Sequence, residues 1–342
     1  MSRMRLAWSV VLLLCALLPW PVLAQGAGVL TGTVVNGTAG GGSTEGLEVV
    51  LRAFQGQEQS ERRTEQRTTV TDTDGAFRFE GLETGEDWVY LVRVTYSGVS
   101  YSSGLLSFAE GQGELSAEVP VYETTTDSAQ TAVERAHIFL NFAEDRLTAT
   151  ELYVFQNPTD RTYVGIDEVD GRRWTAKFLL PEDSQDLVLD DGTLGARFLS
   201  IDGGFVDTEP QWPGTTQVLF SYAVDCPGGW CDLSRRLMQP TVNLNVLVEE
   251  VGATVESQDL TLEGRREAEG RAYLNYVAHA LGAGEQIGLR IRLSGGAQAV
   301  RSAQPVRMQS LPWILLGTVL AVFPLIYPFW RQRVQAAARV ER

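Results

Sequence analysis

One stretch decides the fold: Trp88-Val89-Tyr90-Leu91-Val92-Arg93-Val94-Thr95-Tyr96. Large apolar side chains stand at every second position of this stretch, and a period of two is typical of a β-strand with one buried face. The same alternation returns at Leu115–Val121 and at Val218–Val224. Pairs such as Asn36-Gly37 and Asp74-Gly75 are typical of the turns between such strands. Because the strips show no 3.6-residue period, the sequence predicts an all-β chain built from antiparallel β-sandwiches.

Four motifs in the first third of the chain point to a family. They are Gly32-Thr33-Val34-Val35-Asn36, Leu47-Glu48-Val49-Val50-Leu51, Thr71-Asp72-Thr73-Asp74-Gly75-Ala76-Phe77-Arg78-Phe79-Glu80-Gly81-Leu82 and Tyr90-Leu91-Val92-Arg93-Val94-Thr95-Tyr96. With these motifs, residues 27–122 resemble a carboxypeptidase regulatory-like domain. The resemblance implies a transthyretin-like sandwich of seven strands, here assigned to residues 25–123. In that family the module is an accessory to the catalytic part. Neither His137 nor His279 begins the His-x-x-Glu pair of a zinc peptidase.

The patterning then divides the chain. Residues 124–129 are polar, which is typical of a linker. Strand-like alternation of apolar and polar residues returns after residue 129. We expect residues 130–293 to form a second, larger β-sandwich of about eight to ten strands. The Gly-, Ala-, Gln- and Ser-rich residues 294–310 are typical of a flexible stalk.

The beginning of the chain has the pattern of a secretory signal peptide. Arg3 and Arg5 precede the apolar run Leu6–Leu18, and small residues stand at the positions that a cut after Ala24 requires. The sequence therefore predicts that residues 1–24 are removed on export. A retained N-terminal anchor is the alternative interpretation.

The opposite end has the pattern of a membrane span. Residues 311–330 contain no charged side chain, and 20 residues of helix cross about 30 Å of hydrocarbon. Residues 331–342 follow at once and contain Arg331, Arg333, Arg339 and Arg342. By the positive-inside rule we expect them to form a cytoplasmic tail. The residues expected at the membrane interface are Trp313, Trp330, Arg331 and Arg333. We therefore expect a single-pass protein of the plasma membrane whose bulk is extracytoplasmic.

Composition limits the classes of partner. The net charge is −15 and the chain has 43 acidic against 28 basic residues, which argues against nucleic-acid binding and favours cationic partners or simple solubility. With two His and one Lys the chain offers little for a His-rich metal site or a catalytic relay.

Once the leader is removed, two cysteines remain, in Cys226-Pro227-Gly228-Gly229-Trp230-Cys231. Pro-Gly-Gly forms a turn that returns the chain, so we expect a disulfide between Cys226 and Cys231 in an oxidising compartment. The alternative is redox catalysis or metal binding. The spacing differs from Cys-x-x-Cys, and two thiolates without nearby His do not complete a zinc site.

Several acidic and aromatic groups admit a chemical interpretation beside a structural one. Asp72-Thr73-Asp74-Gly75 with Glu83 matches parts of a calcium loop but also suits a hairpin turn. Two clusters of acidic residues could supply a general acid/base pair or could lie in solvated loops. The first cluster is Asp167, Glu168 and Asp170, and the second is Glu182 and Asp183. Three tryptophans suit sugar stacking or core packing; they are Trp174, Trp212 and Trp230. We favour the structural interpretation throughout and assign no catalytic, cofactor or metal residue.

These inferences lead to a hypothesis about function. The sequence favours a non-enzymatic, membrane-anchored extracytoplasmic binding or scaffold protein of the bacterial cell envelope. Its affinity would come from β-edge pairing or aromatic loop contacts with an envelope protein or glycan. The alternatives are a carbohydrate-binding module and a hydrolase that uses the acidic loops of the second domain.

Overall fold

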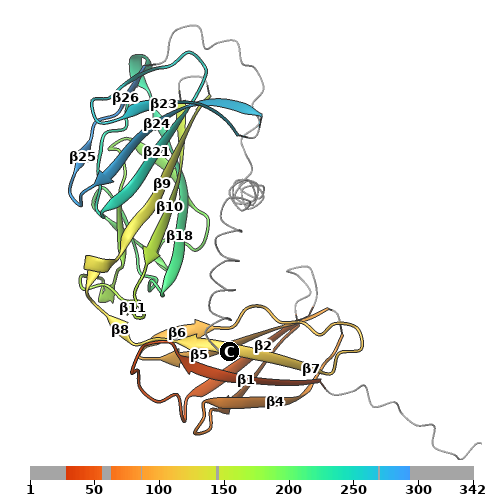
Figure 1. Cartoon of the computed structure of the whole chain (residues 1–342). Coiled ribbons are helices and arrows are strands. Elements are labelled where there is room, and N and C mark those ends of the chain that lie inside the picture. Colours follow the sequence, from red (N-terminus) through yellow and green to blue (C-terminus); the bar gives the residue numbers. More distant parts are fainter. Residues whose placement is uncertain (1–27, 56–62, 86, 144–145, 269, 293–342) are drawn as a thin grey trace, which may run out of the picture. The chain divides into compact units, whose positions relative to one another are not determined.

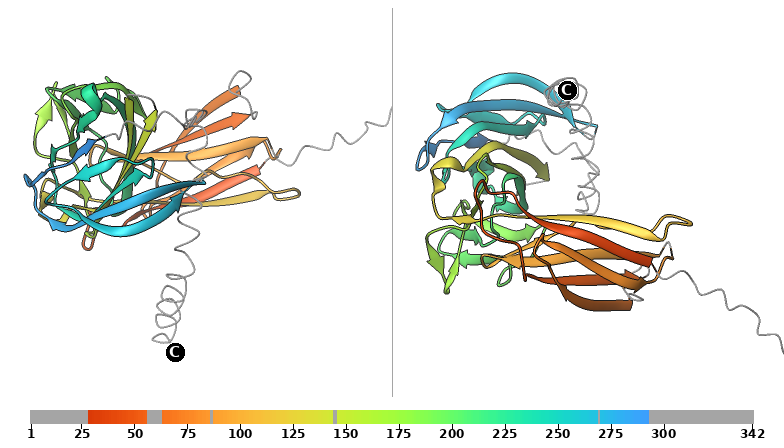
Figure 2. Two further views of the ribbon diagram at one scale, coloured as in Figure 1. Left: turned by 90° about the horizontal axis from the view of Figure 1, so that it is seen from above. Right: turned by 60° about the horizontal axis from the view of Figure 1, so that its bottom comes forward.

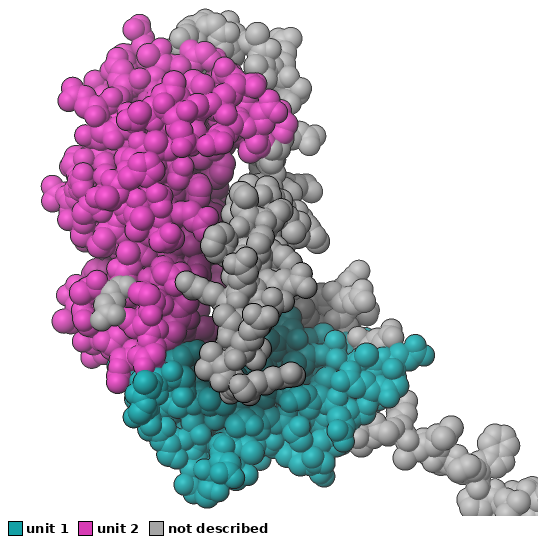
Figure 3. Space-filling view, in the orientation of Figure 1, with its two compact units in different colours: residues 1–124 teal, residues 125–342 magenta. Residues whose placement is uncertain are grey.

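The computed structural model describes residues 28–55, 63–85, 87–143, 146–268 and 270–292. These residues form strands and two short 3₁₀ turns, so the predicted all-β class is confirmed. The chain divides into two compact units, residues 1–124 and 125–342 (Figure 3).

Unit 1 is built from seven strands in two sheets (Figure 1, Figure 2). The strands are β1 (Gly28–Asn36), β2 (Glu48–Gln55), β3 (Arg63–Val70), β4 (Ala76–Leu82), β5 (Trp88–Tyr96), β6 (Val99–Ser102) and β7 (Glu114–Val121). One sheet has the order β4-β1-β7 and the other the order β3-β2-β5-β6. The neighbours pair antiparallel except β1 and β7, which run parallel.

The alternating strip forms β5, at an interior position of the four-stranded sheet. Trp88, Tyr90, Val92 and Val94 are at most 5% exposed, whereas the side chains between them are half-buried. The Tyr90 ring meets the Phe108 ring edge to face at 5.7 Å, and its hydroxyl donates to the Glu83 carbonyl at 2.6 Å. Burial of such side chains contributes about 1.5–3 kcal/mol each, so this strip supplies much of the stability of unit 1.

Unit 2 is organised around one sheet of seven strands with the order β15-β18-β10-β9-β21-β24-β23. The strands are β9 (Ala132–Ala143), β10 (Arg146–Asn157), β15 (Ser184–Leu189), β18 (Gly214–Asp225), β21 (Thr241–Glu249), β23 (Thr261–Ala268) and β24 (Arg271–Leu281). Only β9 and β21 pair parallel among these seven.

Short strands form the rest of unit 2. They are β8 (Thr124–Thr125), β11 (Thr162–Tyr163), β12 (Glu168–Val169), β13 (Arg172–Arg173), β14 (Ala176–Leu179), β16 (Phe198–Ile201), β17 (Gly204–Asp207), β19 (Trp230–Asp232), β20 (Arg235–Arg236), β22 (Thr254–Glu256), β25 (Gln286–Ile287) and β26 (Arg290–Arg292), with the 3₁₀ turns η1 (Ser128–Gln130) and η2 (Pro227–Gly229). The number of strands exceeds the predicted eight to ten, because pieces of two to four residues contain too few alternations to be recognised.

One face of the long sheet packs on this second layer. Phe178 of β14, Phe205 of β17 and Phe220 of β18 have ring centroids 5.0–5.3 Å apart. Ile291 of β26 and Ile138 of β9 belong to the same buried cluster. Unit 2 is therefore sandwich-like, with a long continuous sheet against several short ones.

Both edges of the long sheet are irregular. The register of β15 shifts between Gln185 and Val188, and that of β23 between Leu262 and Gly264. The outer strand β23 also carries Arg265, Arg266 and Glu267, whose side chains are exposed. Bulges and charged side chains disfavour the addition of another strand. The long sheet is thus a poor platform for the β-edge pairing considered from the sequence.

Several predicted segments lie outside the described residues. They are the signal peptide 1–24, the stalk 294–310, the span 311–330 and the tail 331–342, with Trp313, Trp330, Arg331 and Arg333. Within the described ranges, no helix has the length and hydropathy of a membrane span. The predicted linker 124–129 contains β8 and the start of η1, whose N-cap Asp127 accepts the Ala129 N–H at 2.9 Å.

Candidate functional site

The predicted disulfide joins Cys226 and Cys231, whose Cα atoms are 4.7 Å apart. Between them, Gly228 and Gly229 have φ of 66° and 80°, which explains why glycine stands at both positions. The cysteines are 4% and 1% exposed. Because thiol–disulfide exchange requires attack on an accessible sulfur, the burial favours a structural bond over a redox centre.

The acidic loop in unit 1 caps a hairpin. Asp72 Oδ1 accepts the backbone N–H groups of Asp74 at 3.0 Å and Ala76 at 2.8 Å. Gly75 has φ of 75°, and a Cβ there would lie 2.5 Å from the Val34 carbonyl oxygen. The carboxylate is thus used to close the turn between β3 and β4. Among the described residues, no group of three or more His, Cys, Asp or Glu side chains is arranged to hold a metal ion.

The two acidic groups named from the sequence lie on separate turns. Glu168 faces Arg173 at 3.8 Å across the β12–β13 hairpin, and Asp170 occupies its turn with φ of 52°. Glu182 and Asp183 lie exposed in the turn before β15. No hydrogen bond or ion pair joins the two groups in the described part of the chain. They form solvated turns, as favoured from the sequence.

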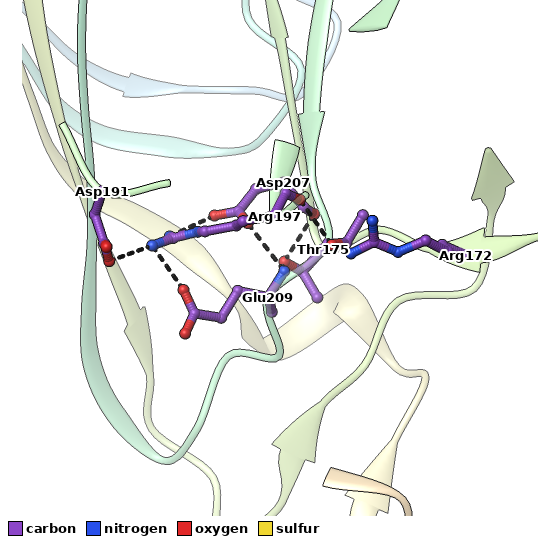
Figure 4. Close-up of polar contacts among 7 residues, drawn as sticks. Arg172, Thr175, Asp191, Arg197, Asp207 and Glu209 are labelled. Carbon is purple, nitrogen blue, oxygen red and sulfur yellow. Dashed lines mark hydrogen bonds and ion pairs between the residues drawn. The ribbon is translucent and has the colours of Figure 1, made fainter. Parts of the chain in front are cut away.

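The structure instead brings together three carboxylates around Arg197, which we name the Arg197 cluster (Asp191, Arg197, Asp207 and Glu209; Figure 4). Arg197 binds Asp207 in a bidentate manner, with Nε 2.9 Å from Oδ1 and Nη2 2.7 Å from Oδ2. Its Nη1 lies 2.8 Å from Asp191 Oδ2 and 2.7 Å from Glu209 Oε2. One guanidinium thus holds three acidic side chains from different segments.

The β16–β17 hairpin positions this cluster. Phe198 pairs with Asp207 in the antiparallel register, so Arg197 and Asp207 meet at the end of the two strands. Asp207 Oδ1 also accepts the Glu209 N–H at 2.9 Å, and the Thr175 hydroxyl donates to the Glu209 carbonyl at 2.6 Å. Backbone bonds therefore fix Glu209, while Asp191 reaches Arg197 from the loop after β15.

The second Arg at this end supports the same loops. Arg172 donates through Nη1 to the Ala196 carbonyl and through Nη2 to the Thr208 hydroxyl at 2.5 Å. The Thr208 hydroxyl in turn donates to the Arg197 carbonyl at 2.7 Å. The loop that carries Arg197 is thus tied to the loop that carries Glu209.

The charges in the Arg197 cluster do not balance, because three carboxylates share one guanidinium. The Asp207 side chain is 5% exposed, that of Glu209 46% and that of Asp191 87%. Partial burial raises the pKa of Glu209, although Arg197 acts in the opposite direction. Burial opposes the charge of Arg197, but its hydrogen bonds to Asp207 and the three negative charges raise its pKa overall. The cluster presents a fixed, partly exposed negative surface.

This geometry suits binding better than hydrolysis. A glycosidase-type pair needs room for substrate between two carboxylates, but the guanidinium of Arg197 occupies that space. Asp191 and Glu209 each use one oxygen on Arg197, and their second oxygens accept no bond from the described residues. Those oxygens can accept hydrogen bonds or ion pairs from a cationic group.

A second polar group, the Arg235 cluster (Glu151, Tyr153, Tyr222 and Arg235), lies inside unit 2. Glu151 Oε1 accepts from Arg235 and, at 2.6 Å, from the Tyr222 hydroxyl, and Oε2 accepts from Tyr153 at 2.8 Å. Glu151 and Arg235 are 1% and 7% exposed. Sequence analysis missed this cluster, although Glu151 interrupts an alternating strip of core residues and is recognisable as a charge at a core position. Its burial favours a structural role.

Two recesses in the described part of the chain are smaller than usual ligand pockets. Two shallow recesses contain about 230 and 290 Å³ of empty space with open solvent included, which is below the ~300–1,000 Å³ typical of ligand sites. Trp174, Trp212 and Trp230 are half-buried. They therefore offer less ring surface for sugar stacking than exposed rings would.

The two histidines lie in strands, as expected. Half-buried His137 is in β9, where burial and then the nearby charge of Arg135 lower its pKa. Exposed His279 is in β24, with Nδ1 2.9 Å from Asn243 Oδ1. Strand β21 separates the two histidine strands in the sheet.

Comparisons with known proteins do not extend this description. No protein-family model matches the chain, and no curated protein is significantly similar to it.

Proposed function

We propose that the chain is a non-enzymatic, membrane-anchored extracytoplasmic binding or scaffold protein of the bacterial cell envelope. In this proposal residues 1–24 direct export, residues 311–330 anchor the chain, and unit 1 is a carboxypeptidase regulatory-like module. Its seven strands in sheets of three and four are compatible with that assignment.

The observation that carries the proposal is the Cys226–Cys231 disulfide. Disulfides persist in oxidising compartments and are rare in the cytosol, so the bond supports an extracytoplasmic location. The bond uses both cysteines that remain after removal of the leader, which leaves no free thiol for cysteine chemistry.

The Arg197 cluster supports the binding role. Arg197 and backbone bonds hold the cluster in place, so its exposed carboxylate oxygens are pre-organised for a cationic partner. This agrees with the acidic composition of the chain. We therefore assign a basic segment of an envelope protein as the preferred partner chemistry.

The location is tested by adding protease to intact spheroplasts that express the full chain. We expect both units to be digested while the tail 331–342 stays protected. Alkylation of the native chain should leave Cys226 and Cys231 unmodified unless a reductant is added. Protection of both units, or free thiols at these cysteines, would refute the location.

The binding role is tested by affinity purification from detergent-solubilised membranes. The full chain is compared with the double variant D191N/E209Q and with the matched control E182Q/D183N, which neutralises two exposed carboxylates elsewhere. We expect a basic partner to be lost from the first variant and retained by the control. Equal recovery with all three proteins would contradict the role of the cluster.

A further inference from the structure

The end of unit 2 where the described chain leaves β26 combines aromatic and basic side chains. Arg290 and Arg292 place their guanidinium carbons 4.9 and 5.4 Å from the centre of the Trp230 ring. Both arginines are exposed and Trp230 is half-buried. Figure 1 shows β26 at the end of unit 2 opposite to β8 and β11.

The side chains on this surface form two rows at different distances from Arg292, the last described residue. In the sheet β19-β26-β22, Trp230 and Thr254 both pair with Arg292 and form the row next to residue 293. Asp232 and Glu256 pair with Arg290 in the next row on the same face, about 7 Å further back.

The two rows differ in charge. Arg290 lies 3.7 Å from Asp232 and opposite Glu256, so its charge is compensated. Arg292 has no ion pair with another described residue. The row nearest the exit therefore carries a net positive charge and an indole ring, on a chain whose overall charge is −15.

We propose that Trp230 and Arg292 contact the phosphate and glycerol region of the bilayer in which this chain is anchored. The inference rests on the proposed membrane anchor and names the residues of unit 2 that contact the lipid. Trp and Arg are side chains that combine an apolar body with a polar end, and both favour the membrane interface.

The tether allows this contact. Eighteen residues, 293–310, separate Arg292 from the predicted span. Eighteen residues span at most about 60 Å at full extension. The proposed anchor therefore keeps the Trp230 row within that distance of the predicted span. The disulfide at the adjacent Cys231 fixes the start of β19, so the indole is presented in a defined position.

The test uses the full chain in nanodiscs of phosphatidylcholine with about one third phosphatidylglycerol and a trace of headgroup-chelated gadolinium lipid. The chain carries 5-fluorotryptophan, and ¹⁹F resonances are assigned by Trp230→Phe and Trp174→Phe. We expect gadolinium to broaden the Trp230 resonance severalfold more than that of Trp174. Arg292→Glu should abolish most of this difference and Arg292→Lys should keep it, whereas the control Arg173→Glu, with the same change in charge, should leave it intact.

The possible failures are distinguishable. If alkaline carbonate extracts the chain from membranes, the proposed anchor is wrong. If the chain stays in the discs but Trp230 is broadened no more than Trp174, the anchor stands and the proposed lipid contact is refuted. Equal loss of broadening with Arg292→Glu and Arg173→Glu would also refute it, because general charge would then account for the effect.

Discussion

Arg197 and Arg235 lie in the same unit and each binds carboxylate, yet their surroundings differ. The Arg235 side chain is 5% exposed and its partner Glu151 1%, whereas Arg197 is 17% exposed and binds one buried and two solvent-accessible carboxylates. The Arg235 cluster balances its charge inside the core, and the Arg197 cluster leaves excess negative charge at the surface. The difference in burial predicts that removal of one charge costs more stability in the Arg235 cluster than in the Arg197 cluster.

The largest expected effect comes from breaking the buried pair. Glu151→Ala leaves the Arg235 guanidinium without a counter-charge in the core, so we expect a loss of about 3–5 kcal/mol in the free energy of unfolding. Urea denaturation followed by tryptophan fluorescence measures it. The double variant E151L/R235M should recover most of the loss, because it removes both charges. A double variant as unstable as Glu151→Ala would contradict this account.

Removal of the buried carboxylate from the other cluster should have an intermediate effect. Asp207→Ala removes the bidentate partner of Arg197 and the acceptor of the Glu209 N–H, but Asp191 and Glu209 remain as counter-charges of the guanidinium, so the loss is smaller than the sum over the single hydrogen bonds. We expect a loss of about 2–4 kcal/mol, measured by the same denaturation. A loss under about 1 kcal/mol would show that the loops hold without Asp207.

Removal of the exposed partner should have a smaller effect on stability. Asp191→Asn removes an ion pair whose carboxylate is 87% exposed, so we expect a change within about 1 kcal/mol that shrinks further in high salt. The comparison predicts that this variant affects partner recovery more than unfolding. A large, salt-independent loss of stability would place Asp191 in the same structural class as Asp207.

The smallest expected effect is the pH dependence of stability that comes from Glu209. Because the folded-state pKa of Glu209 is raised above its usual value of 4.5, the folded chain holds this proton to higher pH than the unfolded chain. Its contribution to stability is therefore greatest in acid and declines as the pH rises from about 4.5 through the folded pKa. The difference in unfolding free energy between the natural chain and Glu209→Gln should decline over this range. A difference that rises over this range would contradict the direction of the Glu209 shift.

The strands with long alternation were predictable and the clusters were not. The strip Trp88–Tyr96 and the strip Val218–Val224 both form strands, since side-chain alternation is a local property of the sequence. The Cys226–Cys231 bond was also predictable, because a short turn brings the two residues together. The Arg197 cluster depends on the β16–β17 pairing and on a loop from β15. Its residues are near neighbours in space only after those strands have found their register.

The parallel pairing in each unit has a consequence for biosynthesis. Leu30 of β1 lies beside Leu115 of β7, and Ile138 of β9 lies beside Val246 of β21. Strands β1 and β9 are interior strands of their sheets, and each pairs with a neighbour that is translated roughly a hundred residues later. Such long-range closure slows folding and leaves open strand edges while the polypeptide is incomplete. Each sheet therefore reaches its final strand order only after its later parallel strand has been synthesised.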